Sequence, residues 1–176
     1  MALSSQLPRT TSVAVATVSY GSSDVLKGFL ESVSASSAGP VMVVVADNGK
    51  NDATVAELTA ASSGRYLPLP RNLGYGGAVN EAICSLPSDV QWVLVSNPDV
   101  VLMPGAIDAL MVAGNSDNRI GAVGPAIMTD GEVYPSARAV PSLRTGIGHA
   151  LFANIWLGNP WTRAYRRDSS REPVRR

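Results

Sequence analysis

The chain has 176 residues, and its 45% hydrophobic content with 16 Gly and 12 Pro is typical of one folded domain with many loops. No apolar run reaches the roughly 18 residues that a membrane-spanning helix needs, and residues 1–11 lack the apolar centre of a secretory signal. A single cysteine, Cys84, and a single histidine, His149, exclude an internal disulfide and a zinc cluster. These observations predict a cytoplasmic protein.

The charges are unevenly distributed, although the formal net charge is zero. Residues 1–162 carry 8 basic and 12 acidic side chains, whereas residues 163–176 carry 6 and 2. A basic end can contact anionic lipid head groups or a nucleic acid, but so short a run is more often a solvated terminus. We expect a flexible N-terminus over 1–11, a folded domain over 12–162, a basic tail over 163–176, and no nucleic-acid partner.

The first half of the chain alternates between apolar runs and helical patterns. Val13–Ser19 is rich in β-branched residues and predicts a strand that is buried on both faces. Residues 41–46 and 65–69 predict two further strands, and residues 55–61 predict a helix between them. Apolar residues at helical spacing predict another helix after the first strand: Leu26, Phe29, Leu30 and Val33.

The same alternation continues to about residue 128. A helical stripe formed by Ala78, Val79, Ala82, Ile83 and Leu86 is followed by a predicted strand at Trp92–Ser96. A helix from Pro104 to about Ala113 and a Gly-broken strand over 120–128 complete the pattern. Such alternation predicts an α/β fold with a parallel or mixed sheet and helices on both faces.

The pattern changes after Thr129. Asp130-Gly131 predicts a turn, and residues 134–141 predict irregular chain. A final helical stripe consists of Leu143, Ile147, Leu151 and Ile155. Packing against a core is the favoured interpretation of this stripe, and contact with a membrane or an acceptor lipid is the alternative.

Polar residues gather at the ends of three predicted strands. Asp47 and Asn48 end the second strand, residues 72–77 follow the third, and Asn97 and Asp99 follow the fourth. Ligands of open α/β sheets bind beyond the carboxyl ends of the strands, near the point where the strand order reverses. We therefore expect these three clusters to form one site.

Several of these residues have both a functional and a structural interpretation. Asp47 can accept hydrogen bonds from a base or a ribose, or can instead form a cap or an Asx-turn. Asp52 is expected to cap a helix, and Arg71 either faces a phosphate or is an exposed surface arginine. Asn80, one turn into a predicted helix, favours a contact across the site because asparagine is mildly unfavourable there.

The glycines of the third cluster are equally open to two interpretations. Gly74, Gly76 and Gly77 either allow the backbone to approach an anionic ligand or form a tight turn. Their spacing matches neither the dinucleotide fingerprint nor the P-loop. An alternative redox or nucleotidyltransferase function is disfavoured, because a Gly-rich signature is missing directly after the first strand.

Asp99 is the sharpest metal-ligand candidate. A carboxylate after an apolar strand, preceded by Asn97 and Pro98, suits a hard divalent cation that also binds phosphates. Mg²⁺ or Mn²⁺ would act as a Lewis acid on a departing diphosphate. The alternative is that Asn-Pro-Asp only forms a turn.

Four segments in this order resemble the signatures of family-two inverting glycosyltransferases: Thr-Val-Ser-Tyr at 17–20, Ala-Asp-Asn-Gly at 46–49, residues 72–80, and Asn-Pro-Asp at 97–99. Segments 134–138, 141–143, 159–161 and 164–166 further resemble rhamnosyltransferases that act on polyprenyl-diphosphate-linked N-acetylglucosamine. The similarity covers residues 12 to 173.

The resemblance implies a GT-A fold, Rossmann-like, that binds a nucleoside diphosphate sugar, dTDP-rhamnose in such relatives. Asp47 would lie near the base or ribose, and Asp99 would stand at the last position of the metal-binding Asp-x-Asp motif, with Asn97 at the first. Arg138 would face the diphosphate or the acceptor, or be a surface arginine. The remaining implied donor-site residues are Thr17, Ser19, Tyr20, Asn48, Asn72, Gly74, Gly76, Gly77 and Asn80.

The resemblance also predicts a truncation before the acceptor half. Relatives continue into a segment that holds the general base, and Asp130, Glu132, Asp168 and Glu172 do not match its pattern. We expect either transfer of a hexose to a lipid-linked saccharide at the inner membrane face, or a non-catalytic fragment that binds nucleotide sugars. The catalytic base is unknown, as are the acceptor and the oligomeric state.

Overall fold

The structure is a computed structural model that describes residues 13–134, 147, 151, 155, 156 and 160. The chain divides into two compact units, residues 1–123 and residues 124–176. Within the described part, no helix is long and apolar enough to cross a membrane. The first unit contains a parallel sheet, and the second contains a short hairpin.

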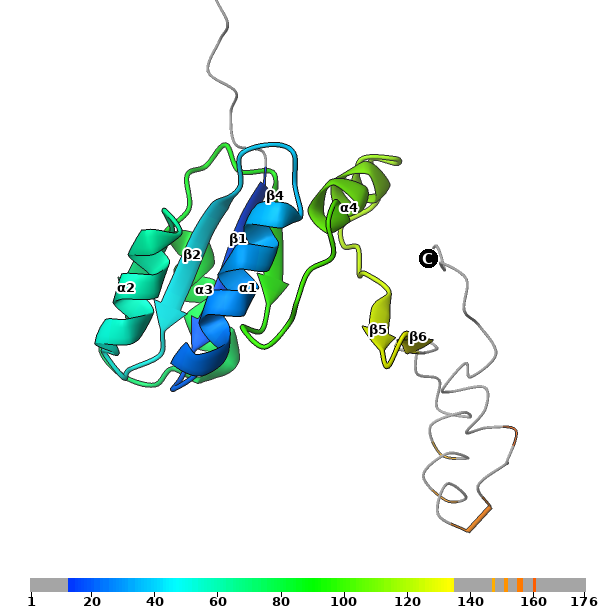
Figure 1. Ribbon diagram of the computed structural model, residues 1–176. Coiled ribbons are helices and arrows are strands. Elements are labelled where there is room, and N and C mark those ends of the chain that lie inside the picture. The colour runs from blue at the N-terminus through cyan, green and yellow to red at the C-terminus, as the bar shows by residue number, and fades with distance from the viewer. Residues whose placement is uncertain (1–12, 135–146, 148–150, 152–154, 157–159, 161–176) are drawn as a thin grey trace, which may run out of the picture. The chain divides into compact units, whose positions relative to one another are not determined.

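The first unit is a four-stranded parallel sheet in the order β3-β2-β1-β4. Its elements alternate along the chain, as Figure 1 shows: β1 (Val13–Ser19), α1 (Ser23–Ala35), β2 (Met42–Asp47), α2 (Ala53–Ala61), β3 (Arg65–Pro68), α3 (Gly74–Cys84), β4 (Trp92–Ser96) and α4 (Ala106–Gly114). The predicted α/β fold, with a parallel sheet and helices on both faces, is confirmed.

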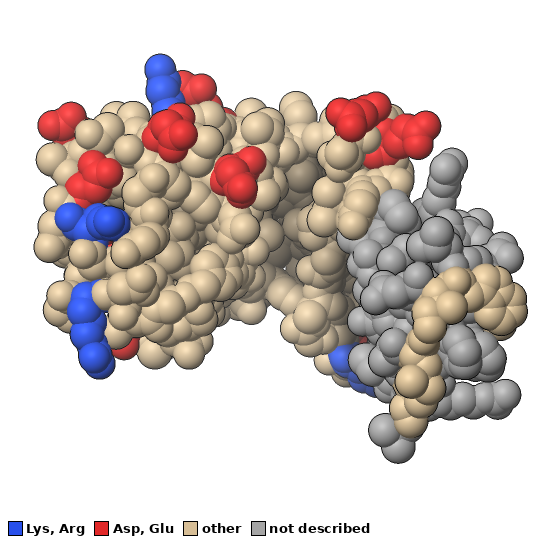
Figure 2. Space-filling view, turned by 90° about the horizontal axis from the view of Figure 1, so that it is seen from below, with Lys and Arg blue, Asp and Glu red and all other residues tan. Residues whose placement is uncertain are grey.

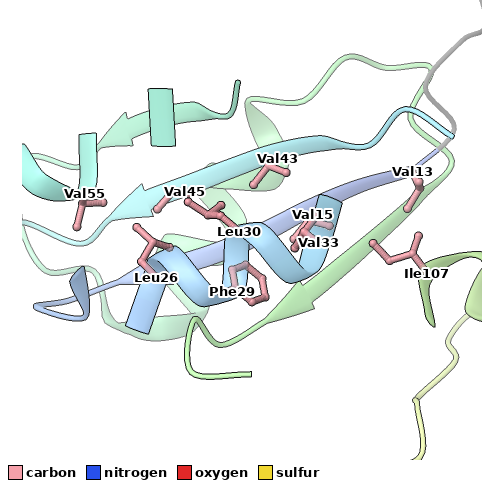
Figure 3. Close-up of a cluster of buried hydrophobic side chains, with 10 residues drawn as sticks. All are labelled: Val13, Val15, Leu26, Phe29, Leu30, Val33, Val43, Val45, Val55 and Ile107. Atoms are coloured by element: carbon pink, nitrogen blue, oxygen red, sulfur yellow. The ribbon is translucent and has the colours of Figure 1, made fainter. Parts of the chain in front are cut away.

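Two hydrophobic clusters hold helices on opposite faces of the sheet. On one face, Phe29 and its neighbours in α1 pack with Val55 of α2 against alternate residues of β1 and β2 (Figure 3). On the other face, α3 packs through Ala78, Val79 and Ala82 against the intervening apolar residues of β1 and β2. Every residue of β1 is buried, as expected for a central strand.

The start of α4 is attached to the end of α1 by several contacts. The Asp108 carboxylate accepts hydrogen bonds from the Ser37 hydroxyl at 2.6 Å and the Ala38 amide at 2.9 Å. These two hydrogen bonds lower the pKa of Asp108 below its usual value, and the bond from Ser37 has the larger effect. Ile107 is 1% exposed, and its amide donates to the Ser36 carbonyl at 3.1 Å. The polypeptide that follows β4 is thereby anchored to the end of α1 and the residues that follow it.

Two sequence predictions differ from the structure. The strand expected over 120–128 is wrong, because residues 120–126 are irregular and only Ile127–Thr129 (β5) is extended. Gly121, Gly124 and Pro125 interrupt this run, and among the described residues β5 pairs with β6 (Glu132–Tyr134) in the second unit. In addition, α3 begins at Gly74, four residues before the expected apolar stripe at Ala78.

The turn predicted at Asp130-Gly131 is confirmed. Both residues have positive φ, 53° and 80°, and they connect β5 to β6. Two successive positive φ values match the right-handed twist of a tight hairpin, and Asp-Gly is a favoured sequence for it.

The final apolar stripe is only partly within the described residues. Ile147 and Leu151 are helical, as predicted, but they are 58% and 60% exposed. Ile155 lies in a turn and is 84% exposed. The core packing favoured for this stripe is therefore not seen at these three residues, and Leu143, Arg138 and the basic tail lie outside the described residues.

Candidate functional site

The three predicted polar clusters lie at one edge of the sheet. All four strands are parallel, so their carboxyl ends share an edge, and Ser19 stands beside Asp47 in the β1–β2 register. In the sheet order β3-β2-β1-β4, strands β2 and β3 lie on one side of β1, and β4 lies on its other side. The strand order therefore reverses between β1 and β4. Tyr20 follows β1, and Asp99 lies shortly after β4. These two residues therefore flank the position where open α/β sheets bind ligands.

Asp47 is buried at this edge and organises the loop that follows β2. Its side chain is 1% exposed. One carboxylate oxygen, Oδ1, accepts the Lys50 amide at 3.0 Å, while Oδ2 accepts the Asp52 amide at 2.6 Å and the Tyr66 hydroxyl at 2.7 Å. The structural interpretation of Asp47 as a turn-forming residue is thus realised, and a contact with a base or ribose stays a prediction.

Asp52 and Tyr66 complete this arrangement. Asp52 caps α2 by accepting the Thr54 amide at 2.9 Å and the Val55 amide at 3.4 Å, as the sequence predicts. Burial, the hydrogen bond to Asp47 and the negative charges of Asp47 and Asp52 raise the pKa of Tyr66 to about 12. Tyr66 is therefore a neutral donor over the whole physiological range.

Asn48 joins the β2 loop to the start of α3. It is 4% exposed, its Nδ2 donates to Asn72 Oδ1 at 3.0 Å, and its Oδ1 accepts the Leu73 amide at 2.8 Å. Asn72 Oδ1 also accepts the Gly74 amide at 2.8 Å. We call these three bonds the asparagine clamp. The clamp brings two of the three predicted clusters into direct contact.

Gly49 allows the asparagine clamp to close. Its φ is +88°, and a Cβ there would lie 2.6 Å from both the Arg71 carbonyl carbon and the Asn72 nitrogen. Only glycine tolerates this conformation and this approach. The Asp-Asn-Gly sequence is therefore needed to place the Gly-rich segment against β2.

The three positions at the start of α3 that are occupied by glycine differ in whether and why the structure requires glycine there. Gly74 has a φ of +72°, and a Cβ on Gly77 would lie 2.9 Å from Leu73 Cβ. Gly76 has neither constraint, because its φ is ordinary and a Cβ there would meet no atom of the described residues within 4 Å. The fold requires glycine at two of these positions, and a ligand that approaches the backbone is a remaining reason for the third.

Two of the three predicted site residues at the end of β1 are buried, and the third is exposed. Thr17 is fully buried, and its Oγ1 is without a hydrogen-bond partner in the described part of the protein. Ser19 is 1% exposed and its hydroxyl lies 3.0 Å from that of Ser22. Tyr20 is 53% exposed, and the Lys50 ammonium lies 4.6 Å from its ring centroid. Of these three, Tyr20 is accessible to a ligand.

The cluster after β4 is exposed. Asn97 and Asp99 are exposed on either side of the buried Pro98, and the Asn97 carbonyl accepts the Ser96 hydroxyl at 3.1 Å. Within the described residues, no three His, Cys, Asp or Glu side chains converge on a possible metal position. Mg²⁺ is often held by one or two carboxylates together with substrate phosphates and water, so Asp99 suits a cation that arrives with a diphosphate.

Asn80 and Arg138 complete the predicted set. Asn80 is exposed on α3, six residues after Gly74, and no side-chain hydrogen bond among the described residues joins it to the other clusters. Arg138 lies outside the described residues.

The carboxyl edge of the sheet carries charged side chains. The arrowheads of β2 and β4 point toward this edge in Figure 1. Figure 2 views the same edge from below and shows both basic and acidic side chains on the part of the protein that contains the sheet.

A pocket of about 160 Å³ lies elsewhere in this unit. Its lining is apolar and includes Val13 and Trp92, at the amino ends of β1 and β4, with Ile107 and Met111 of α4. It holds none of the predicted site residues. The polar edge and this pocket are therefore separate features.

Sequence reasoning missed two residues, Tyr66 and Lys50. Tyr66 gave no signal beyond its place in a strand, because its partner Asp47 is 19 residues away. Lys50 directly follows the Asp-Asn-Gly sequence, and this proximity to a predicted site residue is the signal that could have found it.

We expect Tyr66→Phe to lower the stability of the protein and to change its dependence on alkaline pH. A hydrogen bond to a carboxylate contributes about 1.5–3 kcal/mol. Since folding raises the pKa of Tyr66 from 10.0 to about 12, its stabilisation is complete below pH 10 and is lost as the pH rises through about 12. Urea midpoints measured from neutral to alkaline pH should fall less steeply for Tyr66→Phe than for the wild type. Tyr75→Phe, at an exposed ring, is the control, and equal curves for all three proteins would contradict the assignment.

Comparison with known proteins supports the sequence resemblance. The family description "Glycosyl transferase family 2" matches residues 14–172. N-acetylglucosaminyl-diphospho-decaprenol L-rhamnosyltransferases of two Mycobacterium tuberculosis strains are 45% identical over 165 residues, which cover 88% of this chain and 54% of theirs. The chain thus spans about half the length of these relatives.

Solved structures with a similar backbone include S. aureus TarS. A crystal structure of its residues 1–349 has a TM-score of 0.49 and 20% identity, and covers 65% of this chain and 38% of that one. The same segment in complex with UDP has a TM-score of 0.48. The family match extends over nearly the whole chain, and this protein belongs to glycosyl transferase family 2.

Proposed function

We propose that this chain binds a nucleoside diphosphate sugar at the carboxyl edge of its sheet and forms the donor-binding part of an inverting hexosyltransferase. The donor is proposed to be dTDP-rhamnose and the acceptor a lipid-linked saccharide of cell-wall synthesis. The observation that carries this proposal is the asparagine clamp, which joins the β2 loop to the Gly-rich start of α3 beside the β1–β4 reversal. The 45% identity to L-rhamnosyltransferases supports the choice of sugar.

The exposed groups at this edge suit the parts of such a donor. The first amides of a helix lack partners within it and favour anions. At the start of α3 the asparagine clamp takes the Leu73 and Gly74 amides, so the amides that follow Gly74 would serve the donor. Tyr20 offers an exposed aromatic face to a base. Asp99 would hold Mg²⁺ or Mn²⁺ together with the diphosphate. A cation there would neutralise the charge that builds on the leaving diphosphate.

In an inverting transfer, the acceptor hydroxyl attacks the anomeric carbon while the bond from that carbon to the diphosphate oxygen breaks. The hydroxyl proton must pass to a general base. We assign no residue of this chain to that role. Binding of the donor and transfer of the sugar are therefore separate proposals. A chain that binds the donor without turnover is the second candidate, favoured because the exposed groups at the described edge suit the donor alone.

A peripheral place at the cytoplasmic face of the membrane fits a lipid-linked acceptor. The exposed apolar side chains of Ile147 and Leu151, which are both helical, support this part of the proposal. Apolar side chains on a helix surface can enter the head-group region of a bilayer.

We expect isothermal titration calorimetry to detect dTDP binding in the presence of Mg²⁺, and Asp99→Ala to weaken it by about tenfold or more, because the cation loses its carboxylate ligand. A chelator should weaken wild-type binding by a similar factor. Asp89→Ala is a matched control, because Asp89 is also exposed but precedes β4 at the opposite edge. Equal affinities of all three proteins would argue against Asp99 as the metal ligand.

We expect Gly76→Ala to separate folding from binding. The added methyl group meets no atom within 4 Å in the part of the chain that the structure describes, so the variant should fold with equal or higher stability, since alanine is favoured over glycine in helices by about 1 kcal/mol. Affinity for dTDP should fall, because the methyl group keeps the phosphates from the backbone. Gly28→Ala in α1 has the same open surroundings and should gain stability without loss of affinity. Unchanged dTDP binding by Gly76→Ala would remove Gly76 from the site.

Transfer itself is tested with dTDP-rhamnose and a short lipid-linked N-acetylglucosamine acceptor. We expect rhamnosylated product from the protein if it contains an acceptor-activating base, and donor binding alone if it does not. Product formation should be lost in Asp99→Ala and retained in Asp89→Ala. Absence of both binding and product in the presence of Mg²⁺ would refute the proposed function.

A further inference from the structure

Lys50 stands on a tightly held loop at the candidate site. Its amide donates to Asp47 Oδ1 at 3.0 Å, and the neighbouring Gly49 amide donates to the Asp47 carbonyl at 2.8 Å. Gly49 is packed against the Arg71 and Asn72 backbone, where a Cβ would have no room. The position of the Lys50 backbone is therefore determined by buried contacts, although its side chain is exposed.

The Lys50 side chain reaches from the β2 loop across to the residue that follows β1. Its ammonium lies 4.6 Å from the centroid of the Tyr20 ring, within the range of a cation–π contact. Because β1 lies between β2 and β4, this direction leads toward the strand-order reversal. The ammonium thus lies on the side where the donor is proposed to bind.

The acidic residues that flank Lys50 are already engaged. Asp47 accepts two amides and the Tyr66 hydroxyl, and Asp52 accepts two amides at the start of α2. In the described part of the protein, Lys50 makes no ion pair. The face of the exposed Tyr20 ring is a weak partner for an ammonium in water.

The other described cations are occupied or differently placed. Lys27 pairs with Glu31 on α1 at 3.9 Å, and the Arg65 guanidinium donates to the Ser85 carbonyl at 2.6 Å. Arg119 pairs with Asp117 at 2.9 Å. Arg71 is exposed at the start of the Gly-rich segment. Lys50 and Arg71 are therefore the two described cations placed on the loops of the candidate site.

We propose that Lys50 binds the diphosphate of the donor, its ammonium exchanging the Tyr20 ring for a phosphate oxygen when the nucleotide arrives. This inference rests on the proposed function. A charge-assisted hydrogen bond to phosphate is stronger than a cation–π contact at an exposed site, so the exchange is favourable. It also adds positive charge at a site where Asn97 stands in place of a second carboxylate and leaves the cation with Asp99 alone.

The test compares Lys50→Met, which keeps the length of the side chain but removes its charge, with Lys50→Arg and Lys27→Met. Binding of dTDP and of thymidine, which lacks phosphates, is measured by calorimetry at low and high salt, with urea midpoints as a check of folding. We expect Lys50→Met to weaken dTDP binding by about tenfold at low salt, with a smaller loss at high salt because exposed charges are screened. Thymidine binding and the urea midpoint should not change, Lys50→Arg should retain most of the dTDP affinity, and Lys27→Met should resemble the wild type.

The outcomes separate this inference from the proposed function. Unchanged dTDP affinity in Lys50→Met, or an equal loss for dTDP and thymidine, would overturn the role of Lys50 while wild-type binding of dTDP kept the proposed function. A lower urea midpoint that accounts for the loss would assign Lys50 to the fold instead. Failure of the wild type to bind dTDP would overturn both proposals.

Discussion

The candidate site depends on one buried carboxylate. Asp47 is 1% exposed, and an ionised carboxylate at such a position is tolerated only when its oxygens are satisfied by donors. Its three donors are the Lys50 and Asp52 amides and the Tyr66 hydroxyl, which come from the loop after β2, the start of α2 and strand β3. A single side chain therefore links the loop after β2, the start of α2 and strand β3 through hydrogen bonds. The hydrogen bonds of the buried Asp47 carboxylate therefore help to position the exposed residues of this loop.

The asparagine clamp extends this order from β2 to α3. Asn48 follows Asp47 directly, and its backbone amide donates to the Ser19 carbonyl at 2.8 Å while its side chain holds Asn72 and Leu73. Gly49 makes the close approach possible. Because the start of α3 is held through the clamp, we expect a change at Asn48 to move the Gly-rich segment as well as the loop. Loss of binding in such a variant would therefore show first that the loop structure had changed, and would not by itself show a contact with the ligand.

The sequence predicted the repeating strands and helices well, because burial on both faces of β1 and the apolar stripe of α1 leave strong periodic signals. The prediction is wrong at 120–128, where the apolar composition indicates a strand although Gly121, Gly124 and Pro125 interrupt it. It also placed the start of α3 too late, because glycines are poor helix formers, whereas here Gly74 is required for its φ and Gly77 for its packing against Leu73. Tyr66 and Lys50 act through contacts between separate loops and strands, which no local pattern records.

The residues that carry the family resemblance divide into two groups once burial is known. Thr17, Ser19, Asp47 and Asn48 are buried and build the edge, whereas Tyr20, Gly76, Asn97 and Asp99 are exposed on it. A sequence motif contains residues of both groups. Both kinds are necessary for binding, because one shapes the site and the other contacts the ligand. Exposure separates them, and it directs attention to the accessible groups around Tyr20. The ammonium that lies over that ring belongs to Lys50, which is part of no motif and yet stands on a loop whose path is determined by buried contacts.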